Sequence, residues 1–167
     1  TCTMIQEAAA IASIINGGYY MTPHVVSAIT DQNGNITERF DPVVERQTVS
    51  KKTSEILKTA MSYSVSGGTS TYSKVAGYSM GGKTGTAQKL PRGDGNYVVS
   101  FIGYAPQDDP QIAVVVYVQN GYAGSHTAQA AWRVSDAYLT GANEREAIER
   151  IVAQMEEERG LDRCAAI

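Results

Sequence analysis

Three strand-like segments separated by two short connections constrain the fold more than any other feature of this sequence. The segments span Tyr78–Lys89, Tyr97–Tyr104 and Ile112–Val118, and the last two are rich in β-branched and aromatic residues. The connections contain Gly93-Asp94-Gly95-Asn96 and Gln107-Asp108-Asp109-Pro110, which are turn formers. Both connections are too short for a crossover helix, so we expect the three strands to pair as an antiparallel meander.

Helical periodicity before and after these strands predicts three helices that cover the sheet. The first occupies residues 3–16 and ends at Asn16-Gly17-Gly18, the second starts after a Ser50 cap, and the third occupies residues 127–140. The second helix runs to about residue 65. The predicted buried faces are Met4, Ile5, Ala8, Ile11, Ala12 and Ile15, then Ile56, Leu57, Ala60, Met61 and Val65, then Ala131, Trp132, Ser135, Tyr138 and Leu139. Because Ile112–Val118 is almost wholly apolar, we expect helices on both faces of that strand.

A hairpin is predicted between the first two helices, with strands at His24–Thr30 and Ile36–Phe40. Asn33-Gly34 would form a tight turn, since both residues tolerate positive φ. The chain then forms a loop through Pro42.

The end of the chain has a different character. Glu144–Arg159 predicts a helix whose apolar residues follow an i, i+3, i+4, i+7 spacing while its other faces are charged. We therefore expect a domain over residues 1–141 and a charged amphipathic helix or tail over residues 142–167. That helix would lie on the surface or dock on the domain or a partner.

The composition excludes several functional classes. The chain has 167 residues, of which 43% are hydrophobic and 19% charged, as in a globular domain with a core. A net charge of -3 gives no general reason to bind nucleic acid or an anionic membrane surface. No apolar run has the length of a membrane span. The chain starts at Thr1 without a signal peptide, so we expect a fragment or a processed product.

The cysteines and histidines do not form a metal-binding or disulfide pattern. Cys2 and Cys164 lie near opposite ends of the chain, and we expect two free thiols rather than a bridge between them. His24 and His126 have no second ligand at metal-binding spacing. We expect neither a metal site nor a cofactor.

A glycine-rich string in the first strand segment carries the chemistry, and it also contains a decoy. The residues from Gly77 to Thr84 satisfy the phosphate-loop formula G-x-x-x-x-G-K-T. A phosphate loop lies between a buried strand and a helix, but Thr71–Ala76 is a poor buried strand and Gly85–Pro91 continues into a turn. We therefore reject nucleotide binding.

Several segments in order resemble the large penicillin-binding proteins. Lys83-Thr84-Gly85 is similar to the Lys-Thr-Gly triad on the strand that lines the cleft of penicillin-binding proteins and serine β-lactamases. Gly17–Val26, Gly67-Gly68-Thr69 and Ser100–Pro106 resemble further segments of that family, so the resemblance covers roughly residues 3–140. It implies an α+β fold with a central antiparallel sheet flanked by helices, the C-terminal part of the β-lactamase/transpeptidase-like fold.

The resemblance also implies roles for individual residues. Catalytic roles would belong to Lys83, a fixed cation near the attacking serine, and to Thr86, whose N–H would form half of an oxyanion hole. The substrate would be bound by Gly82, Thr84, Gly85 and Thr86, with the two hydroxyls contacting its carboxylate. The exposed strand edge would let a peptide pair as an added strand. Considered one at a time, Lys83 also fits a solvated strand lysine, and the threonines fit ordinary strand propensity.

The serine nucleophile of the family is absent from this sequence. The family uses Ser-x-x-Lys and Ser-x-Asn, whereas Ser54-Glu55-Ile56-Leu57 has its lysine one place late, at Lys58. The chain alone should not be acylated, and activity would require the N-terminal half of the domain. On this resemblance the ligands are acyl-D-Ala-D-Ala stem peptides of peptidoglycan and β-lactams. The location is the outer face of the bacterial cytoplasmic membrane, with an anchoring segment outside the chain.

Three functions remain open at this point: a cell-wall transpeptidase, a β-lactamase or β-lactam sensor of the same fold, and a non-catalytic interaction module. Ser125-His126-Thr127 either borders the cleft or caps the last helix. Half a sheet leaves an uncovered edge and apolar faces, so a homodimer or a domain-swapped assembly is a further expectation.

Overall fold

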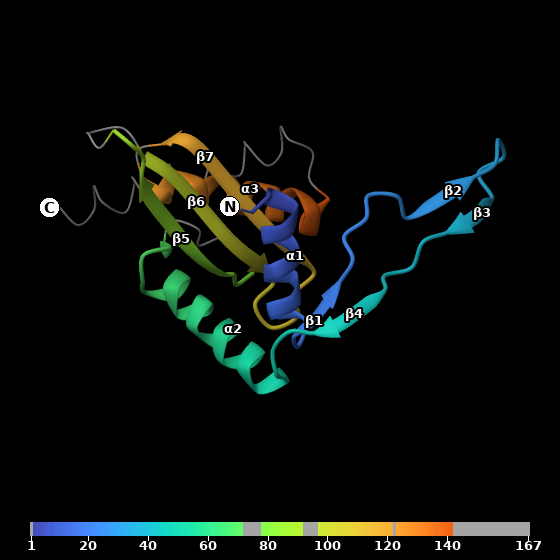
Figure 1. The fold of residues 1–167 in the computed structure, drawn as a ribbon, viewed down its shortest axis with the longest axis horizontal. Helices are drawn as coiled ribbons and strands as arrows, with labels where there is room; N and C mark the ends of the chain where they lie inside the picture. Colours follow the sequence, from blue (N-terminus) through green and yellow to red (C-terminus); the bar gives the residue numbers. More distant parts are fainter. Residues whose placement is uncertain (1, 72–77, 92–96, 122, 142–167) are drawn as a thin grey trace, which may run out of the picture.

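A computed structural model describes residues 2–71, 78–91, 97–121 and 123–141. The predicted helix Glu144–Arg159, the residues of the predicted tail and Cys164 lie outside the described residues. The elements are α1 (Met4–Ile15), β1 (Tyr19–Met21), β2 (Ala28–Thr30), β3 (Ile36–Arg39), β4 (Val44–Gln47), α2 (Lys51–Ser66), β5 (Gly81–Gln88), β6 (Tyr97–Ala105), β7 (Ile112–Gly121) and α3 (Gly124–Thr140). Figure 1 shows helices on both sides of a sheet, with two small hairpins extending from one end.

The predicted meander is confirmed. The three strands form one antiparallel sheet in the order β5-β6-β7, with a continuous β5–β6 register from Gly81↔Tyr104 to Gln88↔Tyr97. β5 begins at Gly81 instead of Tyr78, because Tyr78 turns toward α3 and its hydroxyl donates to the backbone oxygen of Trp132 at 3.5 Å. β5 is therefore an edge strand whose outer side has no neighbouring strand among the described residues.

Helices cover both faces of the sheet, as predicted for the last strand. On one face α3 packs through Ala128 and Ala131 against Phe101 and Val114. On the other face α1 lies near Ala113, which alternates with Val114 along β7. The second half of β7 is less covered, since Tyr117 is 49% exposed.

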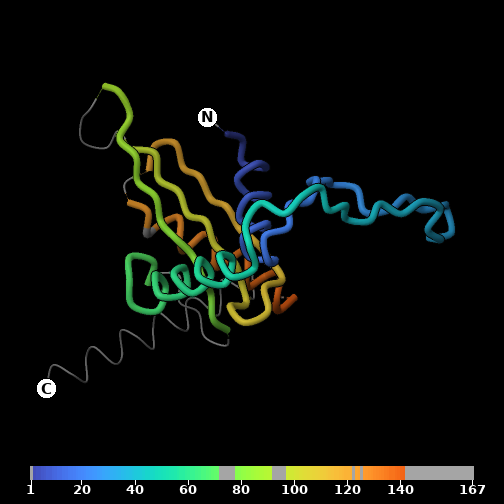
Figure 2. Tube along the Cα trace, turned by 60° about the horizontal axis from the view of Figure 1, so that its bottom comes forward, coloured from blue at the N-terminus to red at the C-terminus, as the bar shows by residue number. Residues whose placement is uncertain are grey.

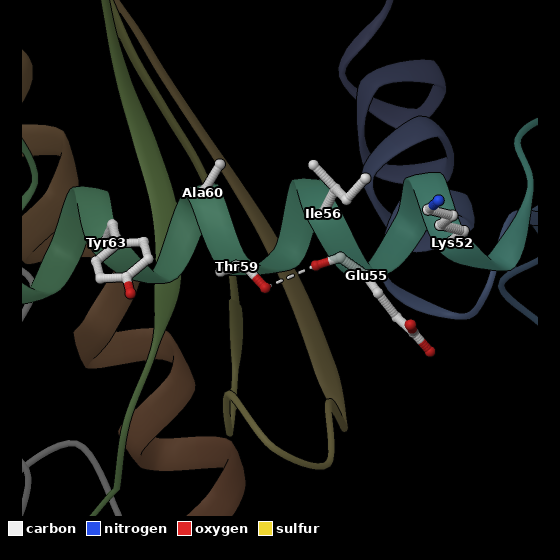
Figure 3. A pocket seen from close by; sticks show the side chains of 6 residues that line it. All are labelled: Lys52, Glu55, Ile56, Thr59, Ala60 and Tyr63. Atoms are coloured by element: carbon white, nitrogen blue, oxygen red, sulfur yellow. Dashed lines mark hydrogen bonds between the residues drawn. The ribbon is translucent and has the colours of Figure 1, made fainter.

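The second helix presents a different face to the sheet from the one that its periodicity predicted. Ser54 and Val65 are buried, while Ile56 and Ala60 are exposed along a hollow of about 430 Å³, which Figure 3 shows together with Tyr63. Leu57 is exposed as well, and Met61 is only half-buried.

Two polar contacts set this orientation. The Ser54 hydroxyl donates to the backbone oxygen of Ile14 in α1, and the Tyr104 hydroxyl donates to that of Lys58 at 3.0 Å. Both contacts hold the polar side of α2 inward, so the predicted apolar face is wrong except for Val65 and, in part, Met61.

The other two predicted helix faces are partly correct. In α1, Ile11 is buried, but Met4 and Ile5 in the first turn are exposed. In α3, Ala131, Trp132 and Ser135 are buried as predicted and Leu139 is half-buried, whereas Tyr138 is 62% exposed. The exposed residues lie at the ends of the helices, where the sheet offers less surface to pack on.

The segment between α1 and α2 is an extended arm made of two hairpins in series. β1 pairs with β4, β2 pairs with β3, and Figure 2 shows the arm extending away from the three-stranded sheet. The predicted strand at residues 24–30 is wrong over its first four residues, since β2 starts at Ala28. The sequence did not predict β1 or β4.

The turn of the outer hairpin also differs from the prediction. Gly34 has φ +85°, but Asn33 does not have a positive φ, so the turn is not the predicted pair of left-handed residues. The Asp31 carboxylate accepts the N–H groups of Asn33 and Asn35, both at 2.9 Å. The Asn35 side chain also donates to this carboxylate, and that hydrogen bond is the largest cause that holds the pKa of Asp31 below its usual value. The hydrogen bonds from the backbone N–H groups lower this pKa further.

Candidate active site

Lys83, Thr84, Gly85 and Thr86 follow one another along the free edge strand β5. Lys83 and Thr86 are exposed, and the two residues between them are half-buried. Successive side chains of a strand point to opposite faces, so Thr84 and Thr86 share the face toward α3, and Lys83 and Gly85 share the other. An edge strand also presents unpaired backbone N–H and C=O groups on its outer side.

Thr69 completes this arrangement from the turn that follows α2. Its hydroxyl lies 3.5 Å from Lys83 Nζ, at the long end of hydrogen-bonding range, and 3.4 Å from Thr84 Oγ1. Lys83 Nζ also donates to the backbone oxygen of Thr84 at 2.7 Å. A cation and two hydroxyls are thus gathered at one point on the strand edge.

The sequence did not single out Thr69 as a site residue. It lies 14 positions before Lys83, and no spacing rule connects residues that far apart across a turn. The one available signal was the resemblance of Gly67-Gly68-Thr69 to a family segment. The contact itself depends on how α2 lies against β5.

Glycines allow neighbouring elements to approach closely behind the site. A Cβ on Gly85 would lie 2.5 Å from Ser100 Oγ, and a Cβ on Gly82 would meet the buried ring of Phe101. Gly82 is itself buried, so it has a packing role, and its predicted contact with substrate stays a prediction. A Cβ on Gly124 would lie 3.0 Å from the Cβ of Thr84, so the start of α3 also borders this strand.

The beginning of α3 corrects one expectation. The helix starts at Gly124 after Ala123, and no side chain caps it. Residues 125–127 therefore lie inside the first turn of the helix, after its N-cap position, and the Thr127 hydroxyl donates to the backbone oxygen of Gly124 at 2.5 Å. His126 is exposed, and Thr127 is buried.

The geometry excludes the phosphate loop. Lys83 and Thr84 lie within a strand that continues to Gln88, whereas a phosphate loop would be followed at once by a helix. Within the described ranges no three His, Cys, Asp or Glu side chains come together as a metal site.

Two tyrosines, the buried Tyr104 and the half-buried Tyr78, form no hydrogen bond with Lys83, Thr84 or Thr86 among the described residues. Burial, with a smaller contribution from Asp108, raises the pKa of Tyr104 to about 12. Burial, with a smaller contribution from Asp136, also raises the pKa of Tyr78 above its ordinary value. Both phenols keep their protons at neutral pH, and we assign them to packing rather than to proton transfer.

Comparison with known protein families shows which family the chain belongs to. The family model of the penicillin binding protein transpeptidase domain matches residues 1–136. The chain belongs to this transpeptidase family. Stage V sporulation protein D of Bacillus subtilis is 40% identical over 122 residues, which cover 71% of this chain and 19% of that protein. Penicillin-binding protein PbpB of Mycolicibacterium smegmatis is 30% identical, with coverage of 67% and 19%.

Solved structures of the family share the fold. The D,D-transpeptidase domain of a peptidoglycan glycosyltransferase from Eggerthella lenta matches with a TM-score of 0.74 and 29% identity, covering 84% of this chain and 33% of that one. PBPA from Mycobacterium tuberculosis matches with a TM-score of 0.73 and 25% identity, covering 83% of this chain and 32% of that one. The α+β transpeptidase-like fold is therefore confirmed. The chain spans about a fifth of its curated relatives and a third of these solved structures.

Proposed function

We propose that this chain supplies the substrate-binding strand of a peptidoglycan D,D-transpeptidase that also binds penicillin, with the serine nucleophile outside the chain. The observation that carries the proposal is the free β5 edge, where Lys83 and Thr84 contact the Thr69 hydroxyl and Thr86 follows two residues along the same strand. A family match over residues 1–136 and relatives named as peptidoglycan D,D-transpeptidases support it.

The substrate class follows from the chemistry of this edge. A peptide that ends in a carboxylate would pair with β5 as an added strand. Its carboxylate would accept hydrogen bonds from the Thr84 and Thr86 hydroxyls. Lys83 would place a positive charge near this carboxylate and near the groups that transfer the proton of the serine. Acyl-D-Ala-D-Ala stem peptides have this form, and β-lactams mimic it.

Acyl transfer needs stabilisation of the oxyanion that forms when a serine attacks the scissile carbonyl. We assign one N–H of the oxyanion hole to Thr86 and the other to the serine itself. Removing one such donor typically costs about 3 kcal/mol of transition-state stabilisation. We also keep Gly85 as a substrate-binding residue through its backbone, since a Cβ there would point toward Ser100 of β6 and not toward the free edge.

The partner in this proposal is the N-terminal part of the same domain, either in the same polypeptide or as a separate piece. This sequence has no Ser-x-x-Lys or Ser-x-Asn. We further propose that residues 1–141 form the domain portion and residues 142–167 a separate charged tail. The proposed location is the outer face of the bacterial cytoplasmic membrane, and the described residues include no helix able to cross a bilayer.

Labelling of the full-length protein with a fluorescent penicillin tests the proposal. We expect covalent labelling of the wild type and a loss of about a hundredfold in the labelling rate for Lys83→Met, because the cation beside the serine is removed. Lys89→Met is the matched control. Lys89 lies one residue beyond the end of β5, and its ammonium group contacts Asn120.

Each other outcome identifies a different function. Rapid release of the bound label would indicate a β-lactamase, and labelling without cross-linking of stem peptides would indicate a sensor. No labelling of the wild type would contradict the proposal and favour an interaction module.

A further inference from the structure

A pair of serines fastens the turn after α2 back onto the last turn of that helix. The Ser70 N–H donates to the Ser64 backbone oxygen at 2.9 Å, and the two hydroxyls lie 3.0 Å apart. Ser70 is fully buried, at 0% exposure. Gly68 passes so close to the helix that a Cβ there would lie 2.9 Å from Ser64 Cα. The turn thus has little freedom to move away from α2.

The residue between Gly68 and Ser70 is Thr69, and it points the other way. Thr69 is exposed, and its hydroxyl reaches toward Lys83 Nζ and Thr84 Oγ1. A lysine has four rotatable side-chain bonds and loses much rotamer freedom when it is held in one place. A partner that is already fixed lowers that cost, so the position of Thr69 bears on how well Lys83 is ordered.

We propose that Ser70, together with Ser64, is a positioning residue for the candidate active site. The serine pair holds Thr69, and Thr69 in turn holds the Lys83 ammonium beside the Thr84 hydroxyl. Thr69 lies directly before Ser70 in the chain and its hydroxyl contacts Lys83 and Thr84, so in this proposal the serines act on the chemistry through Thr69. This inference rests on the proposed transpeptidase function.

A buried serine hydroxyl can also serve stability alone, and the same helix offers a direct comparison. Ser54 is 1% exposed, and its hydroxyl donates to the backbone oxygen of Ile14 in α1. It lies ten residues before Ser64, about 15 Å along the helix axis. Ser54→Ala therefore removes a buried hydroxyl of the same kind, away from Lys83.

The test measures acylation rate and thermal midpoint in the full-length protein, using a fluorescent penicillin. Ser70→Ala and Ser54→Ala should both lower the midpoint, since each removes a buried hydrogen bond. We expect Ser70→Ala to slow acylation roughly tenfold, as for coupled residues in one network, and Ser54→Ala to change it less than about twofold. Ser64→Ala should act in the same direction as Ser70→Ala, and it serves as the second variant if Ser70→Ala fails to fold.

A double-mutant cycle with Thr69→Val shows whether the effect passes through Thr69. If Ser70 acts through that hydroxyl, Ser70→Ala adds no further loss of acylation rate in the Thr69→Val background. Additive losses, or equal rates for Ser70→Ala and Ser54→Ala, would overturn the positioning role. An unlabelled wild type would instead overturn the proposed function. Crystal structures would then decide the present inference: Lys83 Nζ displaced from Thr69 in Ser70→Ala supports it, and an unmoved Nζ rejects it.

Discussion

Gly82 shows how closely the candidate site depends on what lies behind it. The backbone of β5 passes directly over the ring of Phe101, which has 0% exposure and packs against α3 through Ala128 and Ala131. A side chain at this position would move the ring or the strand, and Lys83 follows immediately. Packing against Phe101 and the position of Lys83 are therefore coupled through a single residue.

Gly82→Ala should destabilise the chain by about 2 kcal/mol, because an added methyl group in a close-packed interior forces neighbours to move. Gly67→Ala is the control, since a Cβ on Gly67 has no heavy atom within 4 Å. We expect it to change stability by less than about 0.5 kcal/mol. Urea unfolding of the two variants measures both values, and equal stabilities would show that β5 does not lie this close to Phe101.

The sequence predicted which residues of β5 belong to the candidate site, but it did not predict which side chains from other elements contact them. The Lys-Thr-Gly string and the glycine-rich turn were both visible as motifs. The hydroxyl contact from Thr69 to Lys83 was not, because it depends on how the Ser64–Ser70 pair folds the turn over the strand. A pattern of residues along the chain contains no information about how the turn is oriented relative to the strand.

At the scale of elements, the packing of helix α2 influences the position of the candidate site. α2 lies against β5 and β6 through Val65 and through the hydrogen bond from Tyr104 to Lys58. It turns Ile56 and Tyr63 outward, at 59% and 71% exposure. Its apolar periodicity therefore points away from the sheet.

Val65→Ala should cost about 1–3 kcal/mol, because it opens a cavity among Met80, Ala105 and Trp132. Ile56→Ala removes a larger side chain but should cost less than about 0.5 kcal/mol, since that side chain is mostly in solvent. Chemical denaturation of the chain compares the two. The reverse order would mean that α2 packs through the face its periodicity predicts.

Tyr104 makes the contact between α2 and the sheet sensitive to alkaline pH. Burial raises its pKa to about 12 from an ordinary value of 10, so the folded chain keeps a proton that the unfolded chain loses. The stabilisation is complete below pH 10 and is lost as the pH rises toward 12.

Tyr104→Phe should therefore lower stability at neutral pH by about 1 kcal/mol, through the lost hydrogen bond to Lys58. It should also make the decline above pH 10 less steep. Denaturation midpoints at pH 8 and pH 11 measure this. A decline of the same steepness in both proteins would remove Tyr104 from the explanation, although Tyr78 contributes in the same direction.

The elements that the sequence predicted best are the long ones with many internal contacts. β6 and β7 have nine and ten residues, and their apolar content is high enough to predict strands from the sequence alone. β1 and β4 have three and four residues, too few for a periodic pattern, and they pair across the whole outer hairpin. Their pairing depends on tertiary structure, so local propensity did not reveal it.

The whole molecule leaves several apolar surfaces open. The exposed side of α2, the second half of β7 and the arm all present apolar residues, with Val25 at 96% and Val43 at 62% exposure. Members of the family are several times longer than this chain. We propose that the remainder of the transpeptidase domain covers part of this surface.

Prepared alone, the chain should therefore associate with itself, because exposed apolar patches and a free strand edge favour pairing. Sedimentation velocity across a concentration series would show a shift from monomer to dimer or larger species. The full-length protein should show no such shift over the same range. A chain that remains monomeric throughout would argue against a paired or domain-swapped assembly.

The crystal structure of the full-length protein after reaction with penicillin is the most direct measurement of the central claim. The account predicts that the ligand lies along β5, with its carboxylate within about 3 Å of the Thr84 or Thr86 hydroxyl and its acyl oxygen at the Thr86 N–H. A ligand bound elsewhere, or a β5 edge covered by another strand, would contradict it.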